Sequence, residues 1–127
     1  MERENAPEAV YNLSIGSAEV YDSYMIARIN EGITLNLNNT SELTYIVDKH
    51  FKSKDFVYIT CRQNSYSVDP TIYTEVTHIS TLRAIAIVSE KKIDRNNLNI
   101  ERLFFGKPMM LFETIKDATN WAELIIG

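Results

Sequence analysis

The side chains best suited to recognition chemistry lie together between Arg62 and Pro70, where the sequence reads Arg-Gln-Asn-Ser-Tyr-Ser-Val-Asp-Pro. This segment follows an apolar run at residues 56–61 and precedes a helix start, so it is expected to form a loop between a strand and a helix. Loops in that position of an open α/β sheet bind ligands and partners. The side chains predicted to make such contacts are those of Arg62, Asn64, Ser65, Tyr66 and Ser67.

The end of the same segment has a simpler interpretation. Pro70 is tolerated at the first position of a helix, because the N–H that proline lacks would have no helical partner there. The carboxylate of Asp69, just before it, can accept hydrogen bonds from the free N–H groups of the first turn, which stabilises a helix by about 1 kcal/mol. Asp69 is therefore predicted to begin a helix, and the functional candidates narrow to residues 62–67.

The sequence contains no constellation typical of catalysis. Its four glycines are too widely spaced for a phosphate-binding loop, and there is neither a nucleophile elbow nor a close carboxylate pair. His50 and His78 each lack a second His, Cys or carboxylate at metal-ligand spacing. Cys61 is predicted to be a buried thiol. We therefore expect no enzymatic activity, no bound metal and no cofactor.

Length and charge limit the class of protein. The chain has 127 residues, which predicts a single domain over residues 1–127 with residues 1–9 as a loose tail. The net charge is -4 and no basic run exceeds the pair Lys91 and Lys92, so a nucleic-acid partner is not expected. A single cysteine, a charged start and the lack of an apolar run of roughly 20 residues predict a cytoplasmic protein without a membrane span.

The strand pattern is that of an α/β protein. Two extended runs between residues 11 and 30 meet at Asp22 and Ser23, which predicts a β-hairpin. Further strands are expected at residues 56–61, 82–88 and 109–112, of which the first two are apolar on both faces and require helices on both sides. The element order β, β, α, β, α, β, α, β, α predicts a mixed, mostly parallel five-stranded sheet with about four helices.

Four helices are predicted from apolar residues spaced by three and four. The first is expected to be capped by Asn39 with Glu42 three residues later, and the second follows the loop described above. The third is expected to begin near Asn97 and end at Gly106, and the fourth is expected to be capped by Thr114. The predicted core-facing residues are Leu43, Ile46, Val47, His50 and Phe51; Ile72, Val76 and Ile79; Ile100, Leu103 and Phe104; and Ala118, Trp121, Ala122 and Ile125.

This arrangement resembles the STAS and SpoIIAA-like fold of bacterial anti-sigma-factor antagonists, which has distant SEC14-like relatives. The resemblance spans nearly the whole chain and includes the order of the elements, the apolar strand at Phe56 and the hydroxyl-bearing loop at residues 65–67. Two further segments strengthen the resemblance. Residues 29–32 close the second strand, and residues 107–121 resemble the closing strand and helix of the SpoIIAA-like group. The resemblance implies a small bacterial regulatory protein.

The resemblance also implies a phosphorylation site. In the antagonist family, a partner kinase phosphorylates a serine in the loop after the third strand, and the added charge controls docking. The matching loop here offers Ser65 and Ser67. A phosphate on Ser67 would lie within two residues of the Asp69 carboxylate, which would repel it. Ser65, which is nearer to Arg62 in sequence, is the better candidate.

We therefore expect a non-catalytic regulatory module that binds another protein, such as a kinase or an anti-sigma-like regulator, through the loop after the third strand. A homodimer is compatible with this expectation. The alternative is a carrier or sensor of a small apolar or lipid-like ligand in a pocket between helices and sheet, suggested by the aromatic residues and by Met109 and Met110. A cleft with convergent titratable groups would instead favour an enzyme.

Overall fold

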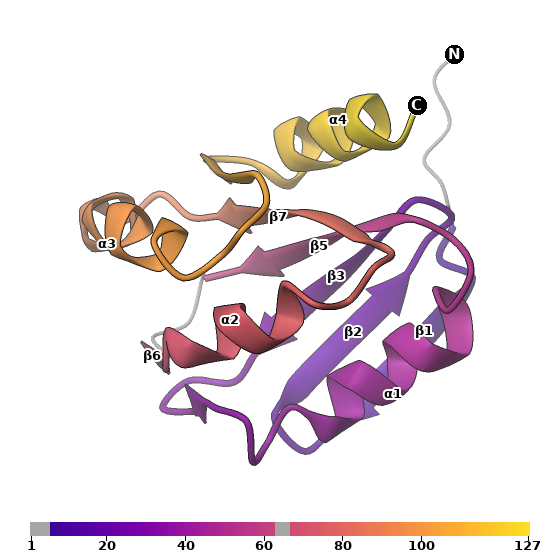
Figure 1. Ribbon diagram of the computed structural model, residues 1–127, viewed down its shortest axis with the longest axis horizontal. Coiled ribbons are helices and arrows are strands. Elements are labelled where there is room, and N and C mark those ends of the chain that lie inside the picture. Colours follow the sequence, from indigo (N-terminus) through magenta and orange to yellow (C-terminus); the bar gives the residue numbers. More distant parts are fainter. Residues whose placement is uncertain (1–5, 63–66) are drawn as a thin grey trace.

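The computed structural model describes residues 6–62 and 67–127, and its centre is a mixed β-sheet (Figure 1). Within these residues the main sheet has six strands, which in spatial order are β1 (Ala9–Leu13), β2 (Gly16–Val20), β3 (Tyr24–Ile29), β5 (Phe56–Cys61), β7 (Leu82–Val88) and β8 (Met109–Phe112). A small second sheet pairs β4 (Thr34–Leu35) with β6 (Ser67–Val68). The same residues form four helices, α1 (Ser41–His50), α2 (Thr71–Val76), α3 (Lys92–Arg102) and α4 (Ile115–Ile126). The predicted α/β class is confirmed.

The antiparallel part of the described sheet contains one strand more than predicted. The first extended run is divided at Gly16 into β1 and β2, which pair from Ala9 with Val20 to Leu13 with Gly16. Gly16 has a φ of +154°, and a Cβ atom there would lie 2.0 Å from the carbonyl oxygen of Arg28. This close approach requires glycine. β1 begins at Ala9, so the sheet extends into the range that was predicted as a tail.

The remaining strands follow the predicted order. β2 and β3 form the expected hairpin, in which the backbone N–H of Tyr21 donates to the carbonyl of Tyr24 at 2.8 Å across the turn at Asp22 and Ser23. β3, β5, β7 and β8 then pair in parallel, each with the next. Because parallel strands end at the same edge of a sheet, the carboxyl ends of β5 and β7 lie side by side.

Helices cover both faces of the main sheet, with α1 and α2 on one face and α4 on the other (Figure 1). The core under α1 and α2 includes Phe51 and Phe56, whose rings stack with centroids 4.3 Å apart. The core under α4 is built from smaller residues, among them Ala84 of β7 and both Ala118 and Ala122 of the helix. Their small side chains allow α4 to lie close to the central strands.

Helix lengths agree with local propensity. α2 spans only Thr71–Val76, as expected for a segment rich in β-branched residues, and Ile79 packs against the core from the turn that follows. α4, with 12 residues, is the longest described helix. Among the described residues, no helix combines the length and apolarity that crossing a bilayer requires.

The side-chain caps predicted for α1 and α4 have different outcomes. The hydroxyl of Thr114 accepts a hydrogen bond from the N–H of Asp117 at 3.1 Å, which confirms the predicted cap of α4. The prediction that Asn39 caps α1 is wrong. Its amide oxygen accepts from the N–H of Asn36 at 3.0 Å and its amide nitrogen donates to the carbonyl of Thr34 at 2.7 Å. Asn39 therefore stabilises the turn before α1.

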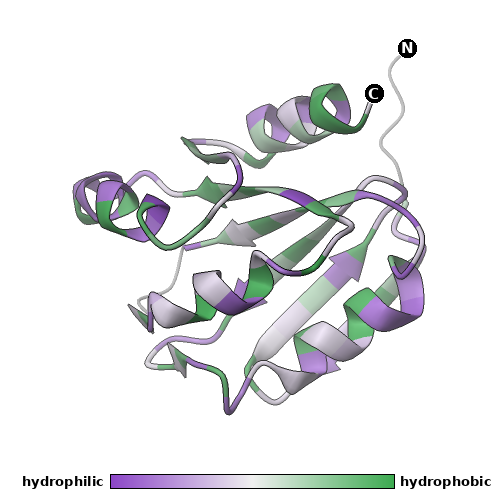
Figure 2. Ribbon diagram, in the orientation of Figure 1, coloured by the Kyte–Doolittle hydropathy of each residue, from purple (hydrophilic) through white to green (hydrophobic). Residues whose placement is uncertain are grey.

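α3 differs most from the prediction, because it begins at Lys92 rather than near Asn97 and ends at Arg102. Its sequence mixes hydrophilic and hydrophobic residues along the whole helix (Figure 2). The residues predicted to face the core are exposed instead, by 54% for Ile100, 82% for Leu103 and 37% for Phe104. The residues that α3 does bury are Asp94, Leu98 and Glu101. The buried face of α3 is therefore largely polar.

Candidate functional site

The carboxyl ends of β5 and β7 bring together residues that are distant in sequence. Arg62 follows β5, Ser89 follows β7, and α3 begins three residues after Ser89. The backbone N–H of Arg62 donates to the carbonyl of Val88 at 2.9 Å, which joins the two strand ends. In open α/β sheets, the crevice beyond the carboxyl ends of the strands is the usual binding position.

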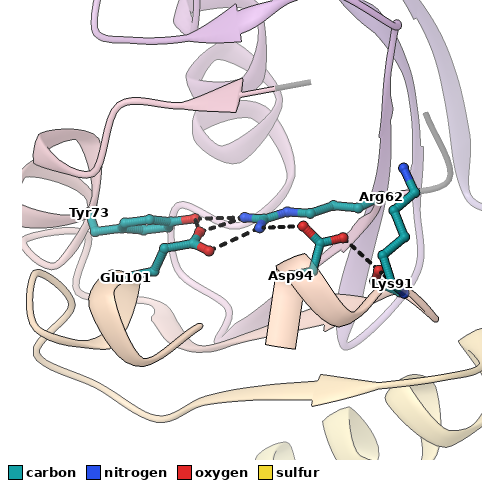
Figure 3. A network of polar contacts seen from close by, with 6 residues as sticks. Arg62, Tyr73, Lys91, Asp94 and Glu101 are labelled. Atoms are coloured by element: carbon teal, nitrogen blue, oxygen red, sulfur yellow. Dashed lines mark hydrogen bonds and ion pairs between the residues drawn. The ribbon is translucent and has the colours of Figure 1, made fainter. Parts of the chain in front are cut away.

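Arg62 is the centre of a buried polar network at this edge (Figure 3). Its guanidinium group donates two hydrogen bonds to Glu101 of α3, from Nη1 to Oε2 at 2.9 Å and from Nη2 to Oε1 at 2.5 Å. The Arg62 and Glu101 side chains are 6% and 7% exposed. This two-point geometry matches the planar guanidinium to the carboxylate and is the strongest form of protein ion pair.

Two further side chains complete the shell around this pair. Tyr73 of α2 accepts a hydrogen bond from Arg62 Nη2 at 3.1 Å and donates its own hydroxyl proton to Glu101. Asp94 Oδ1 lies 3.5 Å from Arg62 Nη1. The other oxygen of Asp94 accepts from the hydroxyl of Ser89 at 2.5 Å, and the Ser89 hydroxyl in turn accepts from the N–H of Lys91 at 3.0 Å. The network links α2, α3 and the ends of both strands.

The charges of the network do not cancel. One guanidinium faces two carboxylates, those of Asp94 and Glu101, and all three groups are buried. Removing charges from water is costly, and close pairing with additional hydrogen bonds offsets that cost. The arrangement can hold α3 in one orientation, because any rotation of the helix would separate Glu101 from Arg62 and leave buried charges without their partners.

An apolar cavity of about 80 Å³ lies directly beside this network, between the sheet and helices α1 and α2. Arg62 and Tyr73 belong to both the network and the cavity wall. The rest of the wall is formed by Met25, Leu35, Thr40, Leu43, Thr44, Val47, Phe56, Tyr58, Thr60, Val68, Ile72, Val76, Ile79, Leu82 and Ile85. The surface that these residues turn toward the cavity is almost entirely apolar, which suits an apolar ligand.

Other reactive side chains are placed in structural roles. Cys61 is buried, and burial raises the pKa of its thiol, so it is poorly suited to act as a nucleophile. His50 Nε2 lies 2.6 Å from the hydroxyl of Tyr11. Lys107 donates to the carbonyls of Ile79 and Leu82 at 2.7 and 2.6 Å. In the described part of the chain, no group of three or more His, Cys, Asp or Glu residues could hold a metal ion.

Comparison with known proteins finds similarity in structure only. No model of a known protein family matches the chain, and no curated protein sequence matches it. The crystal structure of an uncharacterized DUF3478-family protein from Shewanella loihica PV-4, which has a SpoIIAA-like fold, is similar with a TM-score of 0.60. The match covers 96% of this chain and 99% of that one, at 10% sequence identity. The chain has a SpoIIAA-like fold. At this identity the likeness concerns the fold alone.

In this SpoIIAA-like fold, the predicted contact residues have different positions. Arg62 faces inward and is only 6% exposed, so burial removes its side chain from any surface that a partner could reach. Asn64, Ser65 and Tyr66 lie outside the described residues, and their partner-contact role stays a prediction. Ser67 is exposed in β6, where its backbone N–H donates to the carbonyl of Ile33 at 2.9 Å.

Asp69 is used at the start of α2, as predicted from sequence. Its carboxylate accepts hydrogen bonds from the N–H of Thr71 at 3.1 Å and from the hydroxyl of the same residue at 2.8 Å. Pro70 precedes the first helical residue and has helical backbone angles, with φ of −60° and ψ of −20°. The helix therefore begins one residue later than predicted, and Asp69 stabilises its first turn as the sequence indicates.

Sequence reasoning missed four members of the network, namely Tyr73, Ser89, Asp94 and Glu101. A signal for two of them was present, because Asp94 and Glu101 are seven residues apart and so lie on one face of a helix. Leu98 is on the same face and is buried with them. The spacing shows only that these side chains share a face of the helix, and the burial of that face depends on Arg62, which is distant in sequence.

Proposed function

We propose that this protein is a non-catalytic protein-interaction module whose docking surface is the exposed side of α3, together with the exposed Ser67 of β6. The supporting observation is the orientation of α3. It buries Asp94 and Glu101 while Ile93 and Ile100 are 59% and 54% exposed. A helix on the surface of a soluble protein normally does the reverse. Apolar residues grouped on an exposed element are typical of an interaction surface.

The charges on α3 indicate the chemistry of the partner. Because both carboxylates of the helix point toward Arg62, its exposed charged residues are Lys92, Arg95 and Arg102, which are all basic. The chain as a whole carries a net charge of -4. The surface therefore combines apolar and basic groups on an otherwise acidic protein, and it is complementary to a partner with an apolar patch bordered by acidic residues.

The buried network supports this function by keeping the surface in place. A docking helix that is already fixed loses less conformational freedom on binding, and the complex is correspondingly stronger. Arg62 holds Glu101 near the end of α3 and Asp94 near its start. Attachment at two points separated by about two turns restrains both the position and the rotation of the helix.

Affinity capture with three full-length proteins tests the proposal. The bait proteins are the wild type, the double variant Ile100→Ser, Leu103→Ser, and the matched control Leu124→Ser. Ile100 lies in α3 and Leu103 directly after it, and the leucine of the control is 81% exposed on α4. We expect a partner that the wild type and the control recover equally and that the double variant loses. Equal recovery of every partner by all three proteins would exclude α3 as the docking surface, provided that circular dichroism shows each to be folded.

The loop before Ser67 is a separate element of the proposal. Its role in docking, and phosphorylation at Ser65, are carried over from the resemblance to anti-sigma-factor antagonists. Capture with the double variant Ser65→Ala, Tyr66→Ala, compared with the wild type, tests the loop. If this loop variant still recovers the partner that the α3 variant loses, docking involves the helix and not the loop.

A second function, the binding of a small apolar ligand, is favoured by the cavity under α1 and α2. Its volume of about 80 Å³ is well below the ~300 Å³ or more of typical pockets for drug-sized ligands. A short chain or the tip of a longer one therefore suits it better than an entire lipid. Native mass spectrometry of freshly purified protein tests this function, because a retained ligand adds a defined mass that denaturation removes.

A further inference from the structure

We infer that the partner of α3 is an amphipathic helix with acidic residues along one edge, and that it lies along the exposed side of α3 as in a coiled coil. This inference rests on the proposed function and deepens it, because it names the structure and the chemistry of the partner. It depends on the spacing of the exposed residues of α3, on the position of its charges, and on its location at one end of the molecule (Figure 1).

The exposed side of α3 has the residue spacing of a coiled-coil seam. Separations of three, four and three residues, which are those of the a and d positions in a heptad repeat, connect Ile93, Asn96, Ile100 and Leu103. All four side chains are exposed. Leu103 directly follows α3 and keeps helical backbone angles, with φ of −65° and ψ of −23°, so the helical path continues to it. We call these four residues the exposed seam.

The exposed seam is turned away from the buried network. At about 100° of rotation per residue, its direction differs by about 150° from that of the buried residues Asp94, Leu98 and Glu101. A second row with heptad spacing runs through Asn97 and Phe104, but it is nearer to the protein, since Phe104 is 37% exposed. The exposed seam is therefore the side of α3 on which another helix has room to lie.

The spacing along the exposed seam suits a helix better than a strand. Residues at a and d positions follow one another every 3.5 residues on average, which corresponds to about 5.2 Å along a helix. A partner helix has the same repeat, so its apolar side chains fit between those of α3 over the whole seam. Residues on one face of a strand are about 6.6 Å apart and would lose this match within a few residues.

The charges of α3 lie on one flank of the exposed seam. Lys92 is next to the seam, at the position equivalent to g of the heptad, and Arg95 and Arg102 lie further round on the same side. This flank is the one beside β8, because Arg102 Nε donates to the carbonyl of Met109 at 2.9 Å. The other flank begins with the uncharged Asn97. A partner helix with acidic residues on one edge can face the basic flank in one direction only, so the charges fix its direction.

A second copy of this chain is a poorer occupant of the exposed seam. Pairing of α3 with itself would bring together two surfaces whose exposed charges are all basic. Charges beside a coiled-coil seam select the partner, and like charges there repel. Asn96 adds to the selectivity, because one polar residue within a seam lowers affinity and fixes the register of the two helices. An acidic helix meets both requirements.

Binding of synthetic peptides to the full-length protein, followed by fluorescence anisotropy, tests the inference. The probe is a labelled peptide of about 20 residues with leucine at a and d and glutamate at e and g, whose glutamates keep it from pairing with itself. One control peptide has lysine in place of glutamate. The other has the composition of the probe in the alternating order of a strand. We expect saturable binding of the probe and at least about tenfold weaker binding of either control.

Two asparagines of α3 provide a matched pair of variants. Asn96→Leu should tighten binding of the probe about tenfold, because one more leucine side chain is buried in the seam. Asn99→Leu makes the same change at an exposed position about 80° away from the seam, and it should alter the affinity by no more than about twofold. Ile100→Ser, Leu103→Ser should abolish binding and Leu124→Ser should preserve it. Equal effects of Asn96→Leu and Asn99→Leu in folded proteins would overturn the inference.

The outcomes separate this inference from the function on which it rests. A captured partner that Ile100→Ser, Leu103→Ser loses, together with equal affinities for the probe and the alternating peptide, would leave α3 as the docking surface and overturn the helical partner. No captured partner and no binding of any peptide would overturn both.

Two further measurements decide between occupants. Sedimentation of the wild type alone as a dimer, with the double variant as a monomer, would make a second copy the occupant. Binding of α3 to anionic phosphatidylglycerol vesicles, without binding of the probe, would make the surface a lipid contact. Either result would overturn the acidic helix, whereas a monomer that ignores the vesicles and binds the probe supports it.

Discussion

Arg62 and Glu101 form a buried two-point ion pair across 39 residues of sequence, with N–O distances of 2.9 and 2.5 Å. The pair joins the end of β5 to the last turn of α3. A guanidinium and a carboxylate that are buried together stabilise each other, because either one alone would be an uncompensated buried charge. The pair therefore fixes α3 with its polar side inward, and this orientation determines which residues the helix exposes.

Replacement of Glu101 by glutamine should destabilise the protein strongly. Glu101→Gln keeps the shape of the side chain but removes the charge that compensates Arg62, so we expect the free energy of unfolding to fall by about 3 kcal/mol. Urea denaturation followed by circular dichroism measures this. Glu123→Gln, at an exposed position of α4, is the control and should change stability by less than about 0.5 kcal/mol. Similar losses in both variants would show that the buried pair does not stabilise the fold.

Loss of the Tyr73 hydroxyl should have a smaller effect. Tyr73→Phe keeps the ring in the core but removes the group that accepts from Arg62 and donates to Glu101. We expect a loss of about 1–3 kcal/mol, because Arg62 and Glu101, which are both buried and charged, each lose one hydrogen bond. A double-mutant cycle with Glu101→Gln measures the coupling. Strictly additive losses would contradict a shared network, since residues that contact each other are expected to be coupled.

The sequence predicted the elements whose signals are local. β5 and β7 are recognisable because apolar residues on both faces require cover on both sides, and the cap at Thr114 is recognisable from the four residues that form it. The division of the first extended run at Gly16 was not predicted. It depends on the carbonyl of Arg28, which approaches from the next strand.

The orientation of α3 could not be predicted from its own residues. The spacing of Ile100, Leu103 and Phe104 is that of an ordinary core-facing helix, and their hydrophobicity favours the same interpretation. The opposite face is buried because Arg62 provides a cation for Glu101, and this partner is 39 residues away in sequence. Arg62 was correctly singled out as unusual, but the sequence does not show that its side chain turns inward.

Gly16 and Gly32 should differ sharply in their tolerance of a side chain. Both have positive φ angles, of +154° and +82°. A Cβ atom at Gly16 would lie 2.0 Å from the Arg28 carbonyl oxygen, whereas a Cβ atom at Gly32 would have no described atom within 4 Å. We expect Gly16→Ala to lower the free energy of unfolding by about 3 kcal/mol or more, through clash and strain. Gly32→Ala should cost about 1 kcal/mol, from backbone strain alone. Thermal unfolding compares the two, and equal destabilisation would argue against the close contact between β2 and β3.

Cys61 should make stability fall at alkaline pH. Burial is the main cause of its raised pKa in the folded protein, so above about pH 8.5, the ordinary cysteine pKa, the unfolded chain releases this proton while the folded chain keeps it. The unfolded state then binds fewer protons than the folded state, and the free energy of unfolding decreases as pH rises. Urea denaturation between pH 7 and 9.5 measures this decrease for the wild type and for Cys61→Ala. The difference between the two proteins isolates the thiol, because other titrating groups are common to both. We expect the decrease to be smaller in Cys61→Ala, and parallel pH profiles would show that the thiol ionises equally in both states.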